Sequence, residues 1–171
     1  VYIARLHRAD RNDSSHITFV VRNDSSQSDL VFQTSDTTWQ AYNTYGGSNF
    51  YQGGANGRAY KISYNRPFLT RDGPGGRDFF FSNEYPLVRF LEKNGYDVSY
   101  QSGIDTDRRG NLLTNHKAFL SVGHDEYWSG QQRLNVEAAR GAGLNLAFFS
   151  GNEVFWKTRW EDGYRTLVCY K

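Results

Sequence analysis

Apolar runs and amphipathic stretches alternate regularly in the second half of the chain. A run that begins at Pro86 places its apolar residues on one helical face and ends at Gly95, which predicts a helix. Ser129 and Gln132 fit a capping box, which predicts a second helix that ends at Gly141. Short apolar runs around these helices predict strands over residues 96–100, 118–122 and 144–149.

The first half of the chain has a weaker pattern. Alternating or β-branched residues predict strands over residues 16–21, 29–33 and 59–64, and a similar run covers 164–170 at the end of the chain. From Thr34 to about Arg77 the chain is polar and aromatic and carries glycine clusters, including Gly73-Pro74-Gly75-Gly76. A segment of this length without regular structure is uncommon in a domain unless it is functional.

Strands that alternate with helices predict right-handed crossovers and a mostly parallel sheet. The runs over 118–122 and 144–149 are almost wholly apolar, as is typical of strands buried on both faces. We therefore predict a single domain over residues 1–171, with a three-layer α/β fold and a doubly wound, mostly parallel sheet.

Composition and charge exclude several classes of protein. The 171 residues include 20 basic and 18 acidic side chains, and the basic ones are scattered rather than gathered in a stripe. This argues against nucleic acid or an anionic membrane as the main partner. No apolar run approaches the ~18 residues of a membrane span. The 28 aromatic residues exclude disorder, and Cys169, the single cysteine, is expected to pack in the core.

Polar clusters lie where the predicted strands end. They comprise residues 34–43, 123–128 and 150–153, together with residues 83–85 just before the predicted helix. In open α/β sheets, ligands bind outside the carboxyl ends of the strands. We therefore expect these four clusters to meet on one rim of the sheet, and we place the candidate site there.

His124 and Glu126 are two positions apart, so both would point to the same side of an extended chain. That arrangement suits metal ligation, or a general base with an orienting partner. It equally fits a polar strand end in which the histidine caps a carbonyl and the glutamate pairs with an arginine. Asn152 could donate a hydrogen bond to an oxyanion, or serve as a turn residue. Asp105-Thr106-Asp107 lacks the remaining ligands of a calcium loop and is interpreted as a solvated turn.

Tyr42 and Tyr85 are candidate phenolate ligands. A phenol has a pKa of ~10, so only a strongly Lewis-acidic ion would hold it deprotonated near neutrality. Two phenolates and one carboxylate supply three negative charges, which matches a hard trivalent ion such as Fe(III). The alternative is ordinary aromatic packing with each hydroxyl hydrogen-bonded at the surface.

Four motifs occur in a specific order along the chain. They are Thr37-Thr38-Trp39-Gln40-Ala41-Tyr42-Asn43, Glu84-Tyr85-Pro86, Gly123-His124-Asp125-Glu126-Tyr127-Trp128-Ser129 and Phe148-Phe149-Ser150-Gly151-Asn152. Over roughly residues 15–171 this set resembles the C-terminal catalytic domain of the large (β) subunit of the bacterial N,N-dimethylformamidase family.

The resemblance implies a fold similar to class I glutamine amidotransferases and a mononuclear Fe(III) site in place of their cysteine. It assigns Tyr42, Tyr85 and Glu126 as metal ligands. Other motif matches place catalytic groups at His124, Asn152 and Thr38. The implied reaction is hydrolysis of a small N-substituted amide to a carboxylate and an amine.

The resemblance also implies missing parts. The family domain continues beyond the position that matches Lys171, and the family subunit carries an N-terminal region and works with a small subunit. The chain has no methionine. We therefore expect it to be a truncated piece of a larger protein, in which an exposed sheet edge would favour self-association. A cytoplasmic location follows if it is dimethylformamidase-like, and a secreted one if it belongs to a multidomain relative.

Two other functions remain open from the sequence. Trp39, Tyr45, Phe50 and Tyr51 could form an aromatic platform of a non-catalytic module that binds a sugar or a peptide. Alternatively, a hydrolase could use His124 and Glu126 without a metal or with zinc.

Overall fold

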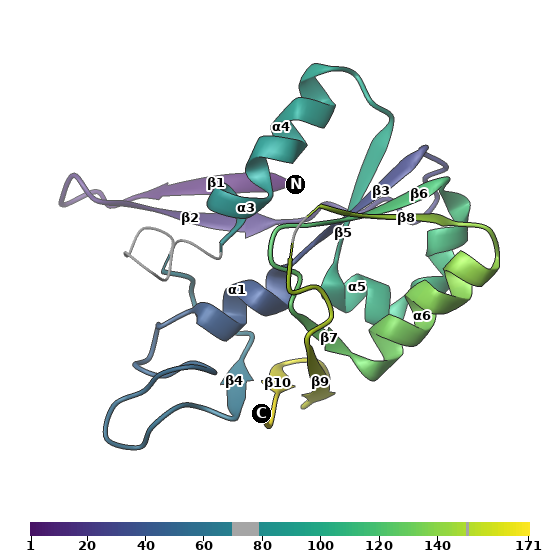
Figure 1. The fold of residues 1–171 in the computed structure, drawn as a ribbon. Coiled ribbons are helices and arrows are strands. Elements are labelled where there is room, and N and C mark those ends of the chain that lie inside the picture. Colours follow the sequence, from purple (N-terminus) through teal and green to yellow (C-terminus); the bar gives the residue numbers. More distant parts are fainter. Residues whose placement is uncertain (70–78, 150) are drawn as a thin grey trace.

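Four parallel strands form the central sheet of the computed structural model, which describes residues 1–69, 79–149 and 151–171 (Figure 1). Their order is β5 (Val98–Ser102), β3 (Leu30–Thr34), β6 (Ala118–Val122) and β8 (Asn145–Phe149). All three neighbouring pairs are parallel. The predicted glycine cluster at 73–76 and the motif residue Ser150 lie outside the described residues.

The chain winds in both directions from β3. It adds β5 on one side of β3 and then β6 and β8 on the other, so the winding reverses between β3 and β6. A reversal of this kind leaves a crevice outside the carboxyl ends of the two strands, where ligands of open α/β sheets bind. The topology therefore places the candidate site between the segments that follow β3 and β6.

Helices cover both faces of the central sheet. They are α1 (Asp36–Tyr42), α3 (Phe80–Asn83), α4 (Tyr85–Lys93), α5 (Gly103–Arg108), α6 (Gly130–Gly141) and the 3-10 helix η1 (Gly110–Asn115). Phe32 of β3 packs in one core cluster with Leu91 of α4, whereas the adjacent Val31 packs in a second cluster with Val136 of α6. Because neighbouring strand residues face opposite sides, β3 is buried on both faces. The predicted α/β architecture with a parallel sheet is confirmed.

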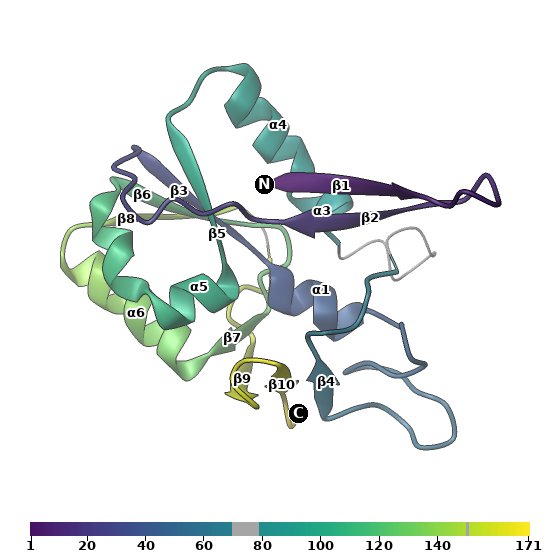
Figure 2. The same cartoon turned by 180° about the vertical axis from the view of Figure 1, so that it is seen from behind.

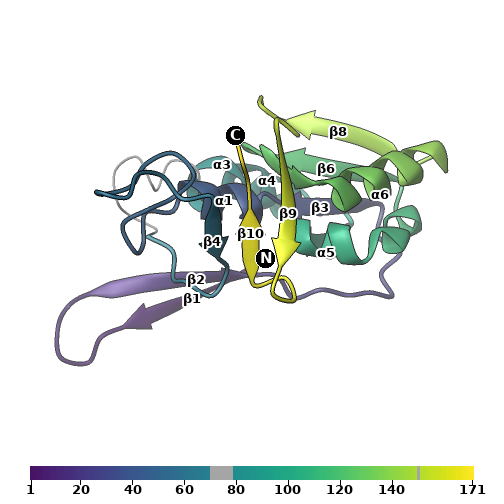
Figure 3. The ribbon, with the colours of Figure 1, turned by 90° about the horizontal axis from the view of Figure 1, so that it is seen from below.

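A second sheet, which the sequence pattern did not predict, lies beside the first (Figure 3). It contains β4 (Lys61–Ser63), β10 (Thr166–Val168), β9 (Trp156–Glu161) and β7 (Tyr127–Ser129), in that order. Only the β7–β9 pair is parallel. Cys169 follows β10 and is buried in a third core cluster with Phe50 and Tyr127, which confirms its predicted packing role.

A two-stranded hairpin of β1 (Tyr2–His7) and β2 (Ser14–Phe19) extends from the domain (Figures 1 and 2). On its inner face, His16 lies edge-on to Phe81. The register pairs Tyr2 with Phe19 on the opposite face. β2 was predicted at 16–21, but β1 was not predicted.

Local signals located the helix ends well. The Ser129 hydroxyl accepts a hydrogen bond from the N–H of Gln132 at the start of α6, as the capping pattern predicts. At the end of α4, Gly95 has a positive φ of 70°, and the N–H of Tyr96 donates back to the carbonyl of Leu91. Because Tyr96 takes part in this turn, β5 begins two residues later than predicted.

Two local predictions were wrong. The segment after Thr34 begins with helix α1 rather than a loop. Asp105 and Asp107, predicted in a solvated turn, are buried in α5, where Asp105 completes a capping box with Ser102. Within the described part of the chain, no helix is both long enough and apolar enough to cross a membrane.

Candidate functional site

Buried polar contacts join the segments that follow β3 and β6. Gln33, at the end of β3, donates to Oδ2 of Asp125 at 2.5 Å, and the hydroxyl of Ser121 donates to the same oxygen at 2.8 Å. All three side chains are buried. Burial raises the pKa of Asp125 to about 7, because desolvation outweighs these hydrogen bonds. The segment that carries the predicted His124 and Glu126 is therefore held against the end of β3.

Glu84 connects the start of α4 to the same place. Its carboxylate accepts hydrogen bonds from the N–H of Ser35 at 2.7 Å and from the indole N–H of Trp39 at 2.9 Å. The side chain is fully buried, and burial raises its pKa to about 8. Predicted clusters 34–43, 83–85 and 123–128 therefore meet, as the rim hypothesis requires.

The sharpest feature of the rim is a group of phenols around one carboxylate, called here the tyrosine–glutamate cluster (Tyr42, Tyr51, Glu126 and Tyr127). Oη of Tyr42 lies 2.8 Å from Oε2 of Glu126, and Oη of Tyr51 lies 2.7 Å from Oε1. The oxygens of Tyr42 and Tyr51 are themselves 2.8 Å apart, with their rings stacked. Tyr127 donates to the oxygen of Tyr51 at 2.6 Å.

Helix α1 places the first of these phenols. Thr38 and Tyr42 are one helical turn apart and share a face of α1. The hydroxyl of Thr38 accepts the N–H of Glu126 at 3.0 Å, and the carbonyl of Glu126 accepts the N–H of Trp156 at the start of β9. The backbone of Glu126 is thus fixed on both sides, which aims its carboxylate at Tyr42.

A loop places the second phenol. The side-chain amide of Asn49 donates to the carbonyl of Tyr42 at 2.8 Å, while its oxygen accepts the N–H of Tyr51 at 2.8 Å. Asn49 itself is buried. This one side chain therefore ties the position of Tyr51 to the end of α1.

The electrostatics of the cluster favour protonated phenols. Burial, together with hydrogen bonding to Glu126, holds the pKa of Tyr42 and of Tyr51 well above the ordinary value. Lys171 donates to the Tyr127 hydroxyl at 2.6 Å and sits over the ring of Tyr51 at 3.2 Å. Burial lowers the pKa of Lys171 to about 8. With no metal ion, both phenols act as donors to the Glu126 carboxylate.

The number of phenol protons limits the hydrogen bonds that the cluster can form. Each phenol carries one proton, so once both donate to Glu126, no proton remains for the 2.8 Å contact between Tyr42 and Tyr51. A cation among the three groups would satisfy all of these oxygens. Their spacing is that of ordinary O–H···O hydrogen bonds, and it is also compatible with the separation of about 2.8 Å between neighbouring ligands of an octahedral ion with ~2.0 Å bonds. The donor set of two phenols and a carboxylate therefore fits a hard metal ion.

Two of the other predicted site residues, Tyr85 and Asn152, lie at exposed positions. Tyr85 is 39% exposed, and its ring lies near Phe80 and Phe81. Among the described residues, no hydrogen bond joins it to Tyr42 or Glu126. Asn152 is exposed in a turn with a positive φ of 64°. His124 is half-buried and precedes the fully enclosed Asp125.

Tyr51 and Tyr127 were missed as members of the site. Tyr127 follows Glu126 in the third motif, so its position offered a signal. Tyr51 was considered only for an aromatic platform, and that platform was wrong, because Trp39 and Phe50 are 5% and 0% exposed. In the described ranges, no three histidine, cysteine, aspartate or glutamate side chains gather as a metal site. A zinc site centred on His124 and Glu126 therefore finds no third ligand of these types.

Comparison with known proteins gives the family. Residues 1–171, the whole chain, match the family model described as N,N-dimethylformamidase beta subunit-like, C-terminal. A search of curated proteins finds no match. Since the family model extends over the complete chain, the chain belongs to the N,N-dimethylformamidase beta subunit-like, C-terminal family.

Proposed function

We propose that this domain hydrolyses small N-substituted amides to a carboxylate and an amine, using a mononuclear Fe(III) ion. Membership of the family supports the hydrolase class. The observation that carries the metal site is the convergence of Tyr42, Tyr51 and Glu126, whose oxygens lie 2.7 to 2.8 Å apart.

The second phenol ligand is Tyr51 in this proposal. The resemblance of motifs assigned Tyr85 instead, but the ring of Tyr85 lies near Phe80 and Phe81, and in the described part of the chain no hydrogen bond joins it to Tyr42 or Glu126. Tyr51 contacts both Tyr42 and Glu126. Two phenolates and one carboxylate carry three negative charges, which balance a trivalent ion. When bound, such an ion supplies Lewis acidity that polarises a carbonyl or lowers the pKa of water.

The chain's own residues would hold and orient the reacting groups. Thr38 is fully buried and accepts the N–H of Glu126, so we assign it a positioning role. His124, two residues before Glu126, would move the proton from water to the leaving amine. Asn152 is exposed and would donate a hydrogen bond to the amide oxygen. Further segments or subunits of a larger protein would complete the site, as the family description of a beta subunit implies.

Iron loading tests the metal site directly. The purified chain is mixed with a soluble Fe(III) chelate and desalted, and its iron content and visible absorption are measured. We expect near-stoichiometric iron and a broad tyrosinate-to-iron charge-transfer band. Tyr42→Phe, Tyr51→Phe and Glu126→Gln should each lose most of the band, since each removes one anionic ligand.

Tyr45→Phe is the matched control, because Tyr45 is an exposed phenol in the same loop. It should keep both iron and colour. A band that survives Tyr51→Phe but not Tyr85→Phe would restore Tyr85 as the second ligand. A folded, iron-treated chain that remains colourless would overturn the site. Amine release from a panel of small amides, N,N-dimethylformamide included, then tests the reaction.

A further inference from the structure

A separate cavity lies on the opposite face of helix α1 from the tyrosine–glutamate cluster. Thr38 and Tyr42 face the cluster, whereas Asp36 and Gln40, two positions earlier on the helix, face this cavity. Its volume is about 260 Å³, and the ends of β3 and β5 border it. Residues from the base of the hairpin, including Phe19, form another side. The cavity is therefore built by four separate parts of the chain.

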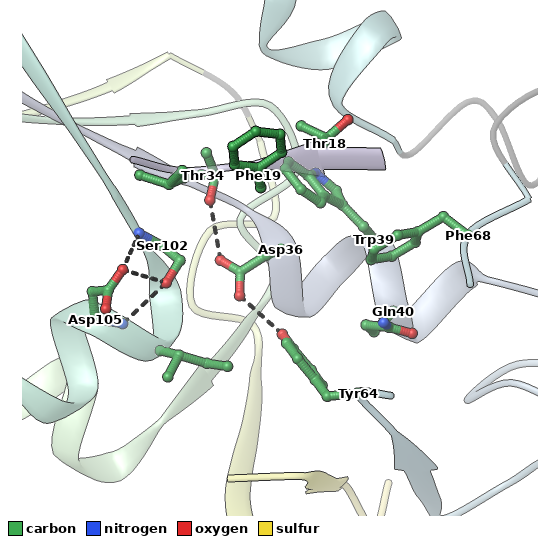
Figure 4. Close-up of a pocket in the computed structure, with 12 residues that line it drawn as sticks. Thr18, Phe19, Thr34, Asp36, Trp39, Gln40, Tyr64, Phe68, Ser102 and Asp105 are labelled. Carbon is green, nitrogen blue, oxygen red and sulfur yellow. Dashed lines mark hydrogen bonds between the residues drawn. The ribbon is translucent and has the colours of Figure 1, made fainter. Parts of the chain in front are cut away.

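The polar floor of the cavity is the carboxylate of Asp36 (Figure 4). Asp36 is only 7% exposed. Its Oδ1 accepts the N–H of Gly103 at 2.6 Å and the hydroxyl of Thr34 at 3.2 Å, and its Oδ2 accepts the hydroxyl of Tyr64 at 3.0 Å. Three donors on one carboxylate favour its ionised form. Burial opposes ionisation and raises the pKa of Asp36 to about 6, so the carboxyl group is ionised at neutral pH.

No side-chain cation balances this charge in the described part of the chain, where the ion pairs leave Asp36 out. The other carboxylate on the cavity wall, Asp105, already pairs with Arg22 and Arg109. Arg66 lies near Gln40 but donates to the carbonyls of Gln40, Tyr45 and Ser48. A buried carboxylate without a counter-ion is costly unless a cation reaches it.

Aromatic rings form part of the wall, beside aliphatic and polar residues such as Ile104 and Gln40. Phe19, Trp39, Tyr64 and Phe68 line the cavity, and Figure 4 shows Tyr64 pointing to Asp36 and Phe68 beyond Trp39. Trp39 and Phe68 meet edge to face, with ring centroids 6.0 Å apart. Ring faces attract cations, and several rings around a carboxylate form the cage that recognises alkylated ammonium groups. Neither an anion nor a strongly hydrated metal ion suits a wall of this composition.

We propose that this cavity binds a small N-alkylated ammonium ion, with its charge against Asp36 and its alkyl groups against the four rings. The cavity is smaller than the ~300–1,000 Å³ of sites for drug-sized ligands, which favours an ion of a few carbon atoms. An ammonium that retains one N–H would add a charged donor to this carboxylate. The site needs neither iron nor an amide substrate.

Trimethylammonium chloride is the probe, and tert-butanol is a neutral molecule of similar shape. Both are titrated into the ¹⁵N-labelled, iron-free chain at constant ionic strength, and the indole N–H signals of the four tryptophans are followed by NMR. We expect a saturable shift of the Trp39 signal with trimethylammonium and a much weaker effect with tert-butanol. The Trp128 signal serves as an internal reference, because Trp128 packs in a different core cluster.

Two variants separate charge from packing. Asp36→Asn keeps the shape and should weaken binding by about tenfold or more, the effect of losing one close charge pair. Asp105→Asn, on the same wall but with its charge already paired, should change binding far less. If Asp36→Asn does not fold, Phe68→Leu at a partly buried position removes one ring face and should weaken binding several-fold.

Each other outcome overturns the proposal. Equal shifts with tert-butanol and trimethylammonium would show an apolar cavity without selectivity for cations. The absence of a saturable shift would show no site at all. Unchanged binding in both Asp36→Asn and Phe68→Leu would place the ligand elsewhere. Since no iron is present, none of these results bears on the metal site.

Discussion

The surroundings of Asp36 shift the pKa of its carboxyl group in opposite directions. The hydrogen bonds from Gly103 and Tyr64 lower its pKa, but burial is the larger effect and raises the pKa from 3.8 to about 6. Tyr64, Asp105 and Asp125 are the titratable groups that face it. A carboxyl group of this kind makes the stability of the folded chain depend on pH.

The sign of this dependence follows from proton binding. Between about pH 4 and pH 6 the folded chain holds more protons at Asp36 than the unfolded chain does. Stability therefore falls as pH rises through this window, by up to about 3 kcal/mol. We expect Asp36→Asn to show a smaller decrease in Tm than the parent between these pH values, measured by thermal unfolding in a series of buffers.

Asp29→Asn is the control for that series, because Asp29 lies at an exposed ion pair with Lys117. It should keep the pH profile of the parent. If the Asp36→Asn profile runs parallel to that of the parent, the assignment of this titration to Asp36 is wrong.

Among the contacts between elements, the junction of α4 with the end of β3 depends on one side chain. Glu84 precedes Tyr85, the first residue of α4, and accepts three hydrogen bonds from Ser35 and Trp39, including one from the Ser35 hydroxyl at 3.0 Å. Trp39 belongs to α1, so this carboxylate holds together the two helices and the strand that border the candidate site.

Removing that acceptor should loosen the whole junction. Glu84→Ala leaves three buried donors without a partner, so we expect a loss of about 3 kcal/mol or more in the free energy of unfolding. Glu84→Gln retains an acceptor oxygen and should lose less. Urea unfolding followed by tryptophan fluorescence measures both. Glu137→Ala, at an exposed pair with Arg133 on α6, is the control and should change stability little.

Elements with strong local signals were predicted well, and elements that depend on distant contacts were not. The strand β6 was predicted residue for residue, and the capping residue of α6 was identified. Helix α1 was missed because it contains two threonines and a tryptophan, has no side-chain cap, and buries six of its seven residues. Tertiary packing, which the sequence pattern does not display, stabilises it.

The same distinction applies to the candidate site. Tyr42, Thr38 and Glu126 meet because they follow neighbouring parallel strands, and strand order makes that juxtaposition predictable. Tyr51 lies on a loop whose course depends on the buried amide of Asn49. No local sequence pattern predicts such a contact. The position of Tyr51 beside Glu126 is therefore seen only in the three-dimensional structure.

The whole molecule carries an apolar surface on its hairpin. Leu6 and Ile17 are 50% and 49% exposed, and Tyr2, on the same face of the hairpin, is 58% exposed. Figure 2 shows the hairpin extending well away from the central sheet. The net charge of only +2 adds little repulsion between copies. Two-stranded hairpins are also marginally stable by themselves.

We therefore expect the isolated chain to associate through this surface. The double variant Leu6→Gln and Ile17→Thr should reduce concentration-dependent association, measured by size-exclusion chromatography with light scattering, and change stability by no more than about 0.5 kcal/mol per site. Leu134→Gln, at an equally exposed position on α6, is the control. A parent chain that remains monomeric at every concentration would contradict this expectation.

The position of β3 at the centre of the sheet has a consequence for protein synthesis. β3 is the first strand of the central sheet to leave the ribosome, yet its partners are β5 and β6, which end at Ser102 and Val122. At about 5–20 residues per second, the last partner follows β3 by roughly 4 to 18 seconds. Until β5 has been made, Val31 and Phe32, which face opposite sides of the finished sheet, have no partner strand of the central sheet, and the other edge of β3 stays unpaired until β6 follows. The central sheet therefore cannot form around β3 until residues up to Val122 have been made, and we expect its folding to begin only then.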